Sequence, residues 1–199
     1  MTSSCSKAKP FASASAPKIT VLVAVYNTER YLPQCLQSLC AQTLSNIQIV
    51  CIDDCSTDHS PYILQQYAQR DNRIVLLKTP HNSGQAVARN LGLTVAQGRY
   101  TTMLDSDDWY APDTLQQAYN ALQQAADYDC ALLQVVMHHD NTGQEEVYPL
   151  RTNKHVLTGE EAFNLSTDHW GIHGLYVLRT DLHKQLPYDT DRKSVVGKE

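Results

Sequence analysis

The sequence has no uninterrupted apolar run of the roughly 20 residues that a membrane-spanning helix requires. It also has no excess of basic residues, since 16 Lys and Arg against 21 Asp and Glu give a net charge of −5. This balance argues against a dedicated nucleic-acid-binding protein, because such proteins carry a basic face. The six cysteines form no CxxC pair and no zinc-type spacing, so we interpret them as reduced thiols in a cytoplasmic protein. A length of 199 residues fits one α/β domain.

Two glycine-rich phosphate-binding motifs are also missing. No GxGxxG follows the first predicted strand, at 19–25, and no GxxxxGK[ST] occurs anywhere in the chain. If the protein binds a phosphorylated ligand, a metal ion rather than a glycine-rich loop has to neutralise the phosphates.

What the sequence does have is an acidic block, Asp105-Ser106-Asp107-Asp108, directly after the apolar run 100–104. Three carboxylates within four residues repel one another, and their ionised forms are costly unless a cation sits among them. Mg²⁺ or Mn²⁺ prefers such oxygen ligands and often bridges to substrate phosphates. Asp105, Asp107 and Asp108 are therefore candidate metal ligands. The alternative is a polar turn that caps the next helix.

Strand and helix patterns alternate along the chain. We predict strands at 19–25, 47–52, 74–77, 100–104 and 130–138, and helices at 29–42, 58–70, 85–97 and 112–126. Further on, a capped helix begins at Thr158, a strand spans 174–179 and a short helix spans 180–185. This alternation predicts a Rossmann-like α/β fold with a mainly parallel sheet, which binds ligands beyond the carboxyl ends of its strands.

Three polar segments end predicted strands at that edge: Tyr26-Asn27, Asp53-Asp54 and the acidic block. Together they suit a nucleotide. Tyr26 could stack on the base, and an aspartate at 53 or 54 could accept a hydrogen bond from a ring N–H. The ribose hydroxyls need acceptors, which Asp105 could supply.

Each of these residues also has a structural interpretation. Tyr26 can be a core aromatic, and Asp54 and Asp58 can be helix caps. Arg89, on the helix after the turn at 81–84, can meet a phosphate, pair with an aspartate or simply be a surface cation. The convergence of the three segments favours a binding site over separate structural roles.

At this point the chain resembles the family 2 glycosyltransferases with the GT-A fold. Four segments match in order and spacing over about residues 18–125: ITVLVAVYN at 19–27, IVCIDDCSTD at 49–58, NSGQAVARNLG at 82–92 with AQGRY at 96–100, and LDSDDW at 104–109. Cys55 is a departure, because the family usually has Gly or Asn at that position.

The resemblance implies a nucleotide-diphospho-sugar donor, most often a UDP-sugar, and a Mn²⁺ or Mg²⁺ cofactor. Asp105-Ser106-Asp107 matches the family's DxD motif, so Asp53 would contact the base, Asp105 the ribose or sugar, and Asp107 the metal. Transfer in this family is typically inverting, with a carboxylate removing the proton of the acceptor hydroxyl. The expected donor-binding residues are Val25, Tyr26, Asn27, Glu29, Asp53, Asp54, Asn82, Gly84, Arg89, Asp105 and Ser106.

The second half matches the family less well. The segment 186–189 resembles the one just upstream of the family's catalytic acid, which makes Asp189 and Asp191 candidate bases. Residues 192–199 have no amphipathic period and look foreign, so we expect a non-native tail and a missing native C-terminus. We expect a disordered leader at 1–17 and one GT-A domain at 18–191, with a nucleotide-sugar-binding half at 18–125 and an incomplete acceptor half at 126–191.

Two other functions stay open. A sugar nucleotidyltransferase would carry a glycine-rich basic loop near the first strand, where this chain has Val25-Tyr26-Asn27-Thr28-Glu29. A chain without its base could also be a non-catalytic nucleotide-sugar-binding module. Family habit implies a glycan or lipid-linked acceptor and peripheral work at the cytoplasmic membrane face.

Overall fold

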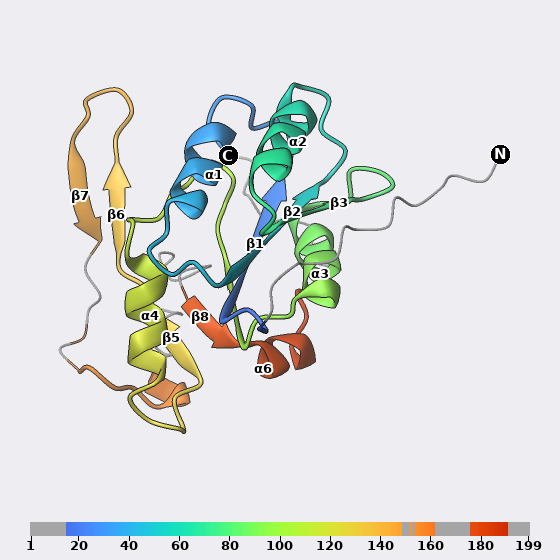
Figure 1. Cartoon of the computed structure of the whole chain (residues 1–199). Coiled ribbons are helices and arrows are strands. Elements are labelled where there is room, and N and C mark those ends of the chain that lie inside the picture. The colour runs from blue at the N-terminus through green and yellow to red at the C-terminus, as the bar shows by residue number, and fades with distance from the viewer. Residues whose placement is uncertain (1–14, 149–151, 153, 162–175, 191–199) are drawn as a thin grey trace.

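The structure is a computed structural model that describes residues 15–148, 152, 154–161 and 176–190 (Figure 1). The predicted tail (192–199) and the predicted leader up to residue 14 lie outside these residues. The last residue of the predicted leader, Pro17, accepts a hydrogen bond from the backbone N–H of Arg99 through its carbonyl oxygen.

A six-stranded sheet with the order β3-β2-β1-β4-β8-β5 forms the centre of the fold. Four neighbouring strands pair with one another in parallel: β1 (Ile19–Val25), β2 (Ile47–Asp53), β3 (Ile74–Lys78) and β4 (Tyr100–Met103). The antiparallel strand β8 (Tyr176–Arg179) separates β4 from β5 (Cys130–Leu132). The prediction of an α/β fold with a mainly parallel sheet is therefore confirmed.

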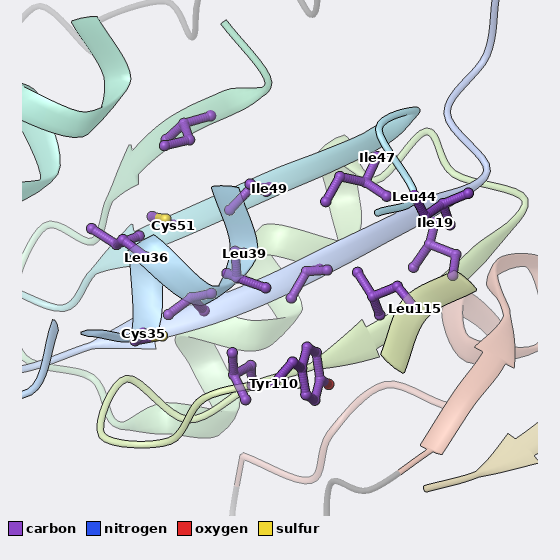
Figure 2. Close-up of a cluster of buried hydrophobic side chains, with 14 of the residues drawn as sticks. Ile19, Cys35, Leu36, Leu39, Leu44, Ile47, Ile49, Cys51, Tyr110 and Leu115 are labelled. Carbon is purple, nitrogen blue, oxygen red and sulfur yellow. The ribbon is translucent and has the colours of Figure 1, made fainter. Parts of the chain in front are cut away.

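Helices cover both faces of this sheet (Figure 1). On one face lie α1 (Leu32–Cys40), α2 (Ser60–Arg70) and α4 (Thr114–Leu122), and on the other lie α3 (Gln85–Val95) and α6 (Thr180–Gln185). The central strand β1 explains this arrangement, because Val21, Val23 and Val25 point into one apolar cluster and Leu22 into the other. Figure 2 shows Leu36 and Leu39 of α1 packed over the sheet in the first cluster.

The prediction of one strand over 130–138 is wrong. This segment forms two strands in different sheets, β5 and β6 (Val135–His138), and β6 pairs with β7 (Glu145–Tyr148) in a separate hairpin. Val136, Met137 and His138 are exposed, so the segment has no buried face to continue the central sheet. A turn at 140–143 closes this hairpin, with Gly143 at φ +67°.

The strand predicted at 19–25 and the helix predicted at 180–185 have the expected ends, whereas the ends of other elements are shifted. The first helix begins at Leu32 rather than at 29 and ends at Cys40, and the helix expected at 112–126 spans Thr114–Leu122. Thr158 begins a capped turn as predicted, since the Glu161 N–H donates to its hydroxyl and its own N–H donates to the Glu161 carboxylate. In the described part of the chain, no helix has the length and apolarity needed to cross a bilayer.

The buried imidazole of His183 links α6 to the sheet. Its Nδ1 lies 2.7 Å from the Thr101 hydroxyl on β4, and its Nε2 lies 2.7 Å from the Tyr188 hydroxyl. Burial, assisted by the positive charge of Arg89, lowers the pKa of His183 to about 4. The ring is therefore neutral at physiological pH.

Gly98 is the point at which the chain enters β4 against β1. A Cβ atom there would lie 2.5 Å from the backbone nitrogen of Thr20 and 2.7 Å from the carbonyl oxygen of Tyr100. Both neighbours are backbone atoms and cannot rotate away. We expect Gly98→Ala to lower the free energy of unfolding by about 1–3 kcal/mol in urea denaturation. Gly159→Ala is the matched control, because no described residue beyond its local chain neighbours comes within 4 Å of its Cβ position. Equal losses in both variants would contradict this account.

His183 makes stability depend on pH. Its pKa is about 4 in the folded protein against an ordinary 6.5, so the unfolded chain binds more protons between these values. The stabilisation is fully present above pH 6.5 and is lost as the pH falls towards 4, by at most about 3 kcal/mol. Comparing urea denaturation at pH 4.5 and 7, we expect His183→Gln to show a smaller pH dependence than the parent. The exposed His81→Gln should leave it unchanged, and identical pH slopes in all three proteins would contradict the prediction.

Candidate functional site

A cleft of about 350 Å³ lies beyond the carboxyl ends of β1, β2 and β4, at the edge where parallel sheets bind ligands. Many of the predicted site residues line it: Val25, Tyr26, Asp54, Asn82, Gly84, Asp105, Ser106 and Asp107. Asn27, Glu29, Asp53, Arg89 and Asp108 were also predicted, but they are not among the lining residues.

Asn27 and Glu29 hold the loop after β1 against the loop after β2. The Asn27 side-chain oxygen accepts a hydrogen bond of 2.7 Å from the Thr57 N–H, and Asn27 itself has φ +52°. The Glu29 carboxylate accepts hydrogen bonds from the backbone N–H and the ring of His59, which lower the Glu29 pKa. Both residues therefore stabilise the loops beside the cleft. A contact of either residue with a ligand stays a prediction.

Cys55 has a left-handed backbone, with φ +61°. Gly and Asn adopt this conformation at little cost, whereas other residues meet steric strain. Although Cys55 stands where the family usually has Gly or Asn, its backbone adopts the left-handed conformation that Gly and Asn favour. The thiol also lies 3.1 Å from the Thr79 carbonyl oxygen, which ties the loop to the end of β3.

Asp54 organises the loop that leads into α3. Its buried carboxylate accepts hydrogen bonds from the Thr79 hydroxyl at 2.6 Å, the Gly84 N–H at 2.7 Å and the Ser83 N–H at 3.0 Å. These donors occupy most of the acceptor positions of a carboxylate.

Asp53 has more acceptor capacity left. Its carboxylate meets the Ser56 N–H at 2.9 Å and the Lys78 ammonium at 3.2 Å. Of the two aspartates, Asp53 therefore has more room for a further hydrogen bond, although Asp54 is the one that lines the cleft. A contact of Asp53 with a base stays a prediction.

The acidic block forms a tight turn in which the Asp108 N–H donates to the Asp105 carbonyl oxygen at 3.0 Å. The Asp105 carboxylate accepts hydrogen bonds from Arg89, at 2.5 Å, and from Gln85, at 2.9 Å. Arg89 thus pairs with an aspartate, one of the roles expected for it. Burial, together with the charges of Asp107 and Asp105, raises the pKa of Asp108 to about 6. One arginine does not balance three carboxylates, so this end of the cleft favours a cation.

The block fits a divalent metal bound together with a phosphorylated ligand. In the described residues, no three acidic, histidine or cysteine side chains are gathered as a ready metal site. Mg²⁺ needs only one or two carboxylates when substrate phosphates and water complete its coordination. Asp107 is exposed, lines the cleft and has no ion pair within the described ranges, so its oxygens are available.

Three lining residues were not predicted: Ala24, Thr28 and Gln85. Gln85 follows Gly84 at the first position of α3, and this position could have indicated its role. Thr28 Oγ1 is the one buried side-chain oxygen or nitrogen in the described part of the chain that has no hydrogen-bond partner.

Of the two candidate bases, the structure describes only Asp189. Asp189 is exposed in the segment after α6 and is not a lining residue. Asp191 lies outside the described residues.

A Rossmann-like sheet, a cleft at the carboxyl ends of its strands and an acidic turn beside that cleft define an α/β protein with a ligand-binding edge. The chain belongs to glycosyl transferase family 2, whose model matches residues 20–186. The resemblance carried by the four sequence segments is thereby confirmed.

Among curated proteins, the chain is 45% identical over 108 residues to an uncharacterized glycosyltransferase of Haemophilus influenzae, covering 54% of this chain and 43% of that protein. It is 44% identical over 105 residues to glycosyltransferase GlyA of Streptococcus pneumoniae, covering 53% of this chain and 15% of that protein. The chain thus spans less than half the length of these relatives.

Among solved structures, the chain resembles S. aureus TarS 1-349 in complex with UDP, with a TM-score of 0.74 and 25% identity. The match covers 89% of this chain and 52% of that one. The complex of TarS 1-349 with UDP-GlcNAc matches with a TM-score of 0.70 over 84% of this chain and 47% of that one. These similarities confirm the GT-A fold.

The hydrogen bonds of Asp54 make it a test of how the cleft is held. Asp54→Ala would leave the Thr79 hydroxyl and the Ser83 and Gly84 N–H groups without their acceptor. We expect a loss of about 2–4 kcal/mol in the free energy of unfolding, measured in urea. The control Asp113→Ala removes an exposed carboxylate that bonds only the neighbouring Gln117 side chain within the described residues, and should cost less than about 0.5 kcal/mol. A loss at Asp54 as small as at Asp113 would contradict the anchoring role.

Proposed function

We propose that this chain is the donor-binding part of an inverting glycosyltransferase that moves a sugar from a nucleotide-diphospho-sugar to an acceptor hydroxyl. The observation that carries the proposal is the cleft, in which Tyr26, Asp105 and Asp107 meet at the carboxyl edge of a family 2 sheet. A glycan or lipid-linked acceptor and peripheral membrane association belong to the same proposal.

Tyr26 and Asp105 suit the nucleoside. The Tyr26 side chain lines the cleft and is 45% exposed, so its ring is free to stack on a base. Arg89 and Gln85 hold one oxygen of Asp105, which leaves the other to accept from ribose or sugar hydroxyls. Asp53, with acceptor capacity left, is the proposed partner of a ring N–H.

Asp107 is the proposed ligand of Mn²⁺ or Mg²⁺, with Asp105 or Asp108 beside it. When bound, such an ion neutralises charge that develops on the departing nucleoside diphosphate. The residues of the cleft would bind and orient the donor, and Arg89 would hold the Asp105 carboxylate in place.

UDP is the proposed nucleotide. TarS, which shares the fold at 25% identity, has been solved with UDP and with UDP-GlcNAc. A uracil ring presents one N–H, which suits a single carboxylate such as Asp53.

Inverting transfer also requires a base that removes the proton from the acceptor hydroxyl as its oxygen bonds to the anomeric carbon. Asp189 and Asp191 are the proposed candidates. A second function, a nucleotide-sugar-binding module without transfer, is favoured by one observation: within the described residues, the carboxylates that line the cleft are Asp54, Asp105 and Asp107 alone. Two assays separate these functions. UDP released from a UDP-sugar indicates a transferase, pyrophosphate released from UTP and a sugar 1-phosphate indicates a nucleotidyltransferase, and neither product indicates a binding module.

Asp107 provides the direct test of donor and metal binding. We expect titration calorimetry of the 199-residue chain with UDP to show binding that requires Mn²⁺. Asp107→Asn should weaken that binding at least tenfold, or about 1.4 kcal/mol, because the amide removes one ligand charge. The exposed Asp113→Asn should bind UDP as the parent does.

A panel of other nucleoside diphosphates in the same experiment tests the choice of base. Absence of heat for every nucleotide would contradict the proposed function. Equal UDP affinity in the parent and in Asp107→Asn would contradict only the metal-binding role.

A further inference from the structure

The segment after α6 is fastened to α3 at one residue. The Tyr188 N–H donates to the Asn90 side-chain oxygen at 2.8 Å, and the Asn90 side-chain nitrogen donates to the Tyr188 carbonyl oxygen at 2.9 Å. Both bonds are made by the Tyr188 backbone, so they do not depend on which side chain stands at this position. Asn90 is the neighbour of Arg89 on α3, so the clamp sits next to the arginine that pairs with the acidic block.

The Tyr188 ring lies under that arginine. The Arg89 guanidinium carbon is 5.6 Å from the ring centroid, and its Nη2 reaches Asp105 Oδ1 at 2.5 Å. The Arg89 side chain is 14% exposed, against 45% for Asp105. The guanidinium therefore spans from a buried aromatic face to a carboxylate at the rim of the cleft.

Three neighbouring side chains hold the Tyr188 hydroxyl. It lies 2.7 Å from His183 Nε2 and 3.3 Å from the Tyr176 hydroxyl, and it contacts the Met103 sulfur. In the described part of the chain, the His183 ring is the only hydrogen-bond partner of the Thr101 hydroxyl. The buried Thr101 O–H needs an acceptor, and Nδ1 is the one within reach, so Thr101 donates to Nδ1. His183 then carries its proton on Nε2 and donates to Tyr188.

Burial raises the pKa of Tyr188 well above its ordinary range, so the ring beneath Arg89 stays an uncharged phenol. Burial likewise keeps His183 neutral. Among the described residues, Asp105 is the carboxylate that pairs with Arg89.

We infer that Tyr188 is a positioning residue of the donor site: held by Asn90 and His183, its ring fixes the Arg89 guanidinium, which in turn orients the Asp105 carboxylate. This inference rests on the proposed function. Tyr188 is not a lining residue of the cleft and acts through Arg89 rather than on the donor. Two segments that the chain separates by about a hundred residues thus share one site.

Calorimetry with UDP and Mn²⁺ on the full chain tests the inference. We expect Tyr188→Ala to weaken UDP binding about tenfold, and Tyr188→Phe, which keeps the ring and the clamp, to weaken it less than about twofold. Tyr188→Phe should still lower the melting temperature, because it leaves the His183 Nε2–H without its acceptor. Tyr188→Phe is therefore expected to lose stability and keep most of its UDP affinity. If Tyr188 had only a structural role, UDP affinity would not depend on whether the ring is kept.

A double-mutant cycle with Arg89→Met identifies the route. Because Tyr188 acts through Arg89, Tyr188→Ala should cause no further loss of UDP affinity when Arg89 is already replaced. Tyr67→Ala is the matched control, since Tyr67 is a half-buried tyrosine on α2 that donates to a backbone carbonyl away from the cleft. It should lower stability without changing UDP affinity.

Parental UDP affinity in Tyr188→Ala, or the same loss with and without Arg89, would overturn the inference alone. If Tyr188→Ala does not fold, Asn90→Ala removes only the clamp and should weaken UDP about threefold, and parental affinity there would also overturn it. Failure of the parent chain to bind UDP would overturn the proposed function, and the inference with it.

Discussion

The parallel register of three strands is the constraint on which the site depends. Val25 of β1 pairs with Asp53 of β2, and Leu22 of β1 pairs with Met103 of β4, so the segments that follow these strands leave the sheet at the same edge. Buried side chains on both faces of β1 make a slip costly, because it would move apolar residues out of the two clusters that cover the sheet. Tyr26, Asp54 and the acidic block meet because the core holds this register.

Charge is the second constraint, because at one end of the cleft three carboxylates face a single arginine. The carboxylates near the sheet edge differ in how far protein groups satisfy them. Asp54 is buried and nearly saturated with hydrogen-bond donors, whereas Asp105 is half-exposed and accepts from one arginine and one glutamine. Asp107 has no ion pair in the described ranges. Asp54 thus builds the loop, whereas Asp107 is available to a ligand.

Periodicity was enough to predict the parallel core, because β1 and β2 are continuous apolar runs and α1 and α3 have one apolar face. It failed at 130–138, where an apolar run looks like one strand but breaks into an edge strand and an exposed hairpin, since only tertiary pairing decides which residues find a partner. Strand ends likewise indicated most lining residues. They could not indicate that Asn27 and Glu29 bridge two loops, or that Tyr188 lies under Arg89, because those contacts join distant segments.

The Asn90–Tyr188 clamp also has a consequence for the order of folding. It closes a loop of 98 residues, whereas the contacts that build β1, β2 and α1 join neighbouring elements. Loop-closure entropy delays such long-range contacts until the local ones are made. During synthesis the sheet edge can form first, and the guanidinium that serves the acidic turn receives its aromatic support only after residue 188 has left the ribosome. The aromatic support of Arg89 therefore depends on a contact of far longer range than those that build the sheet edge.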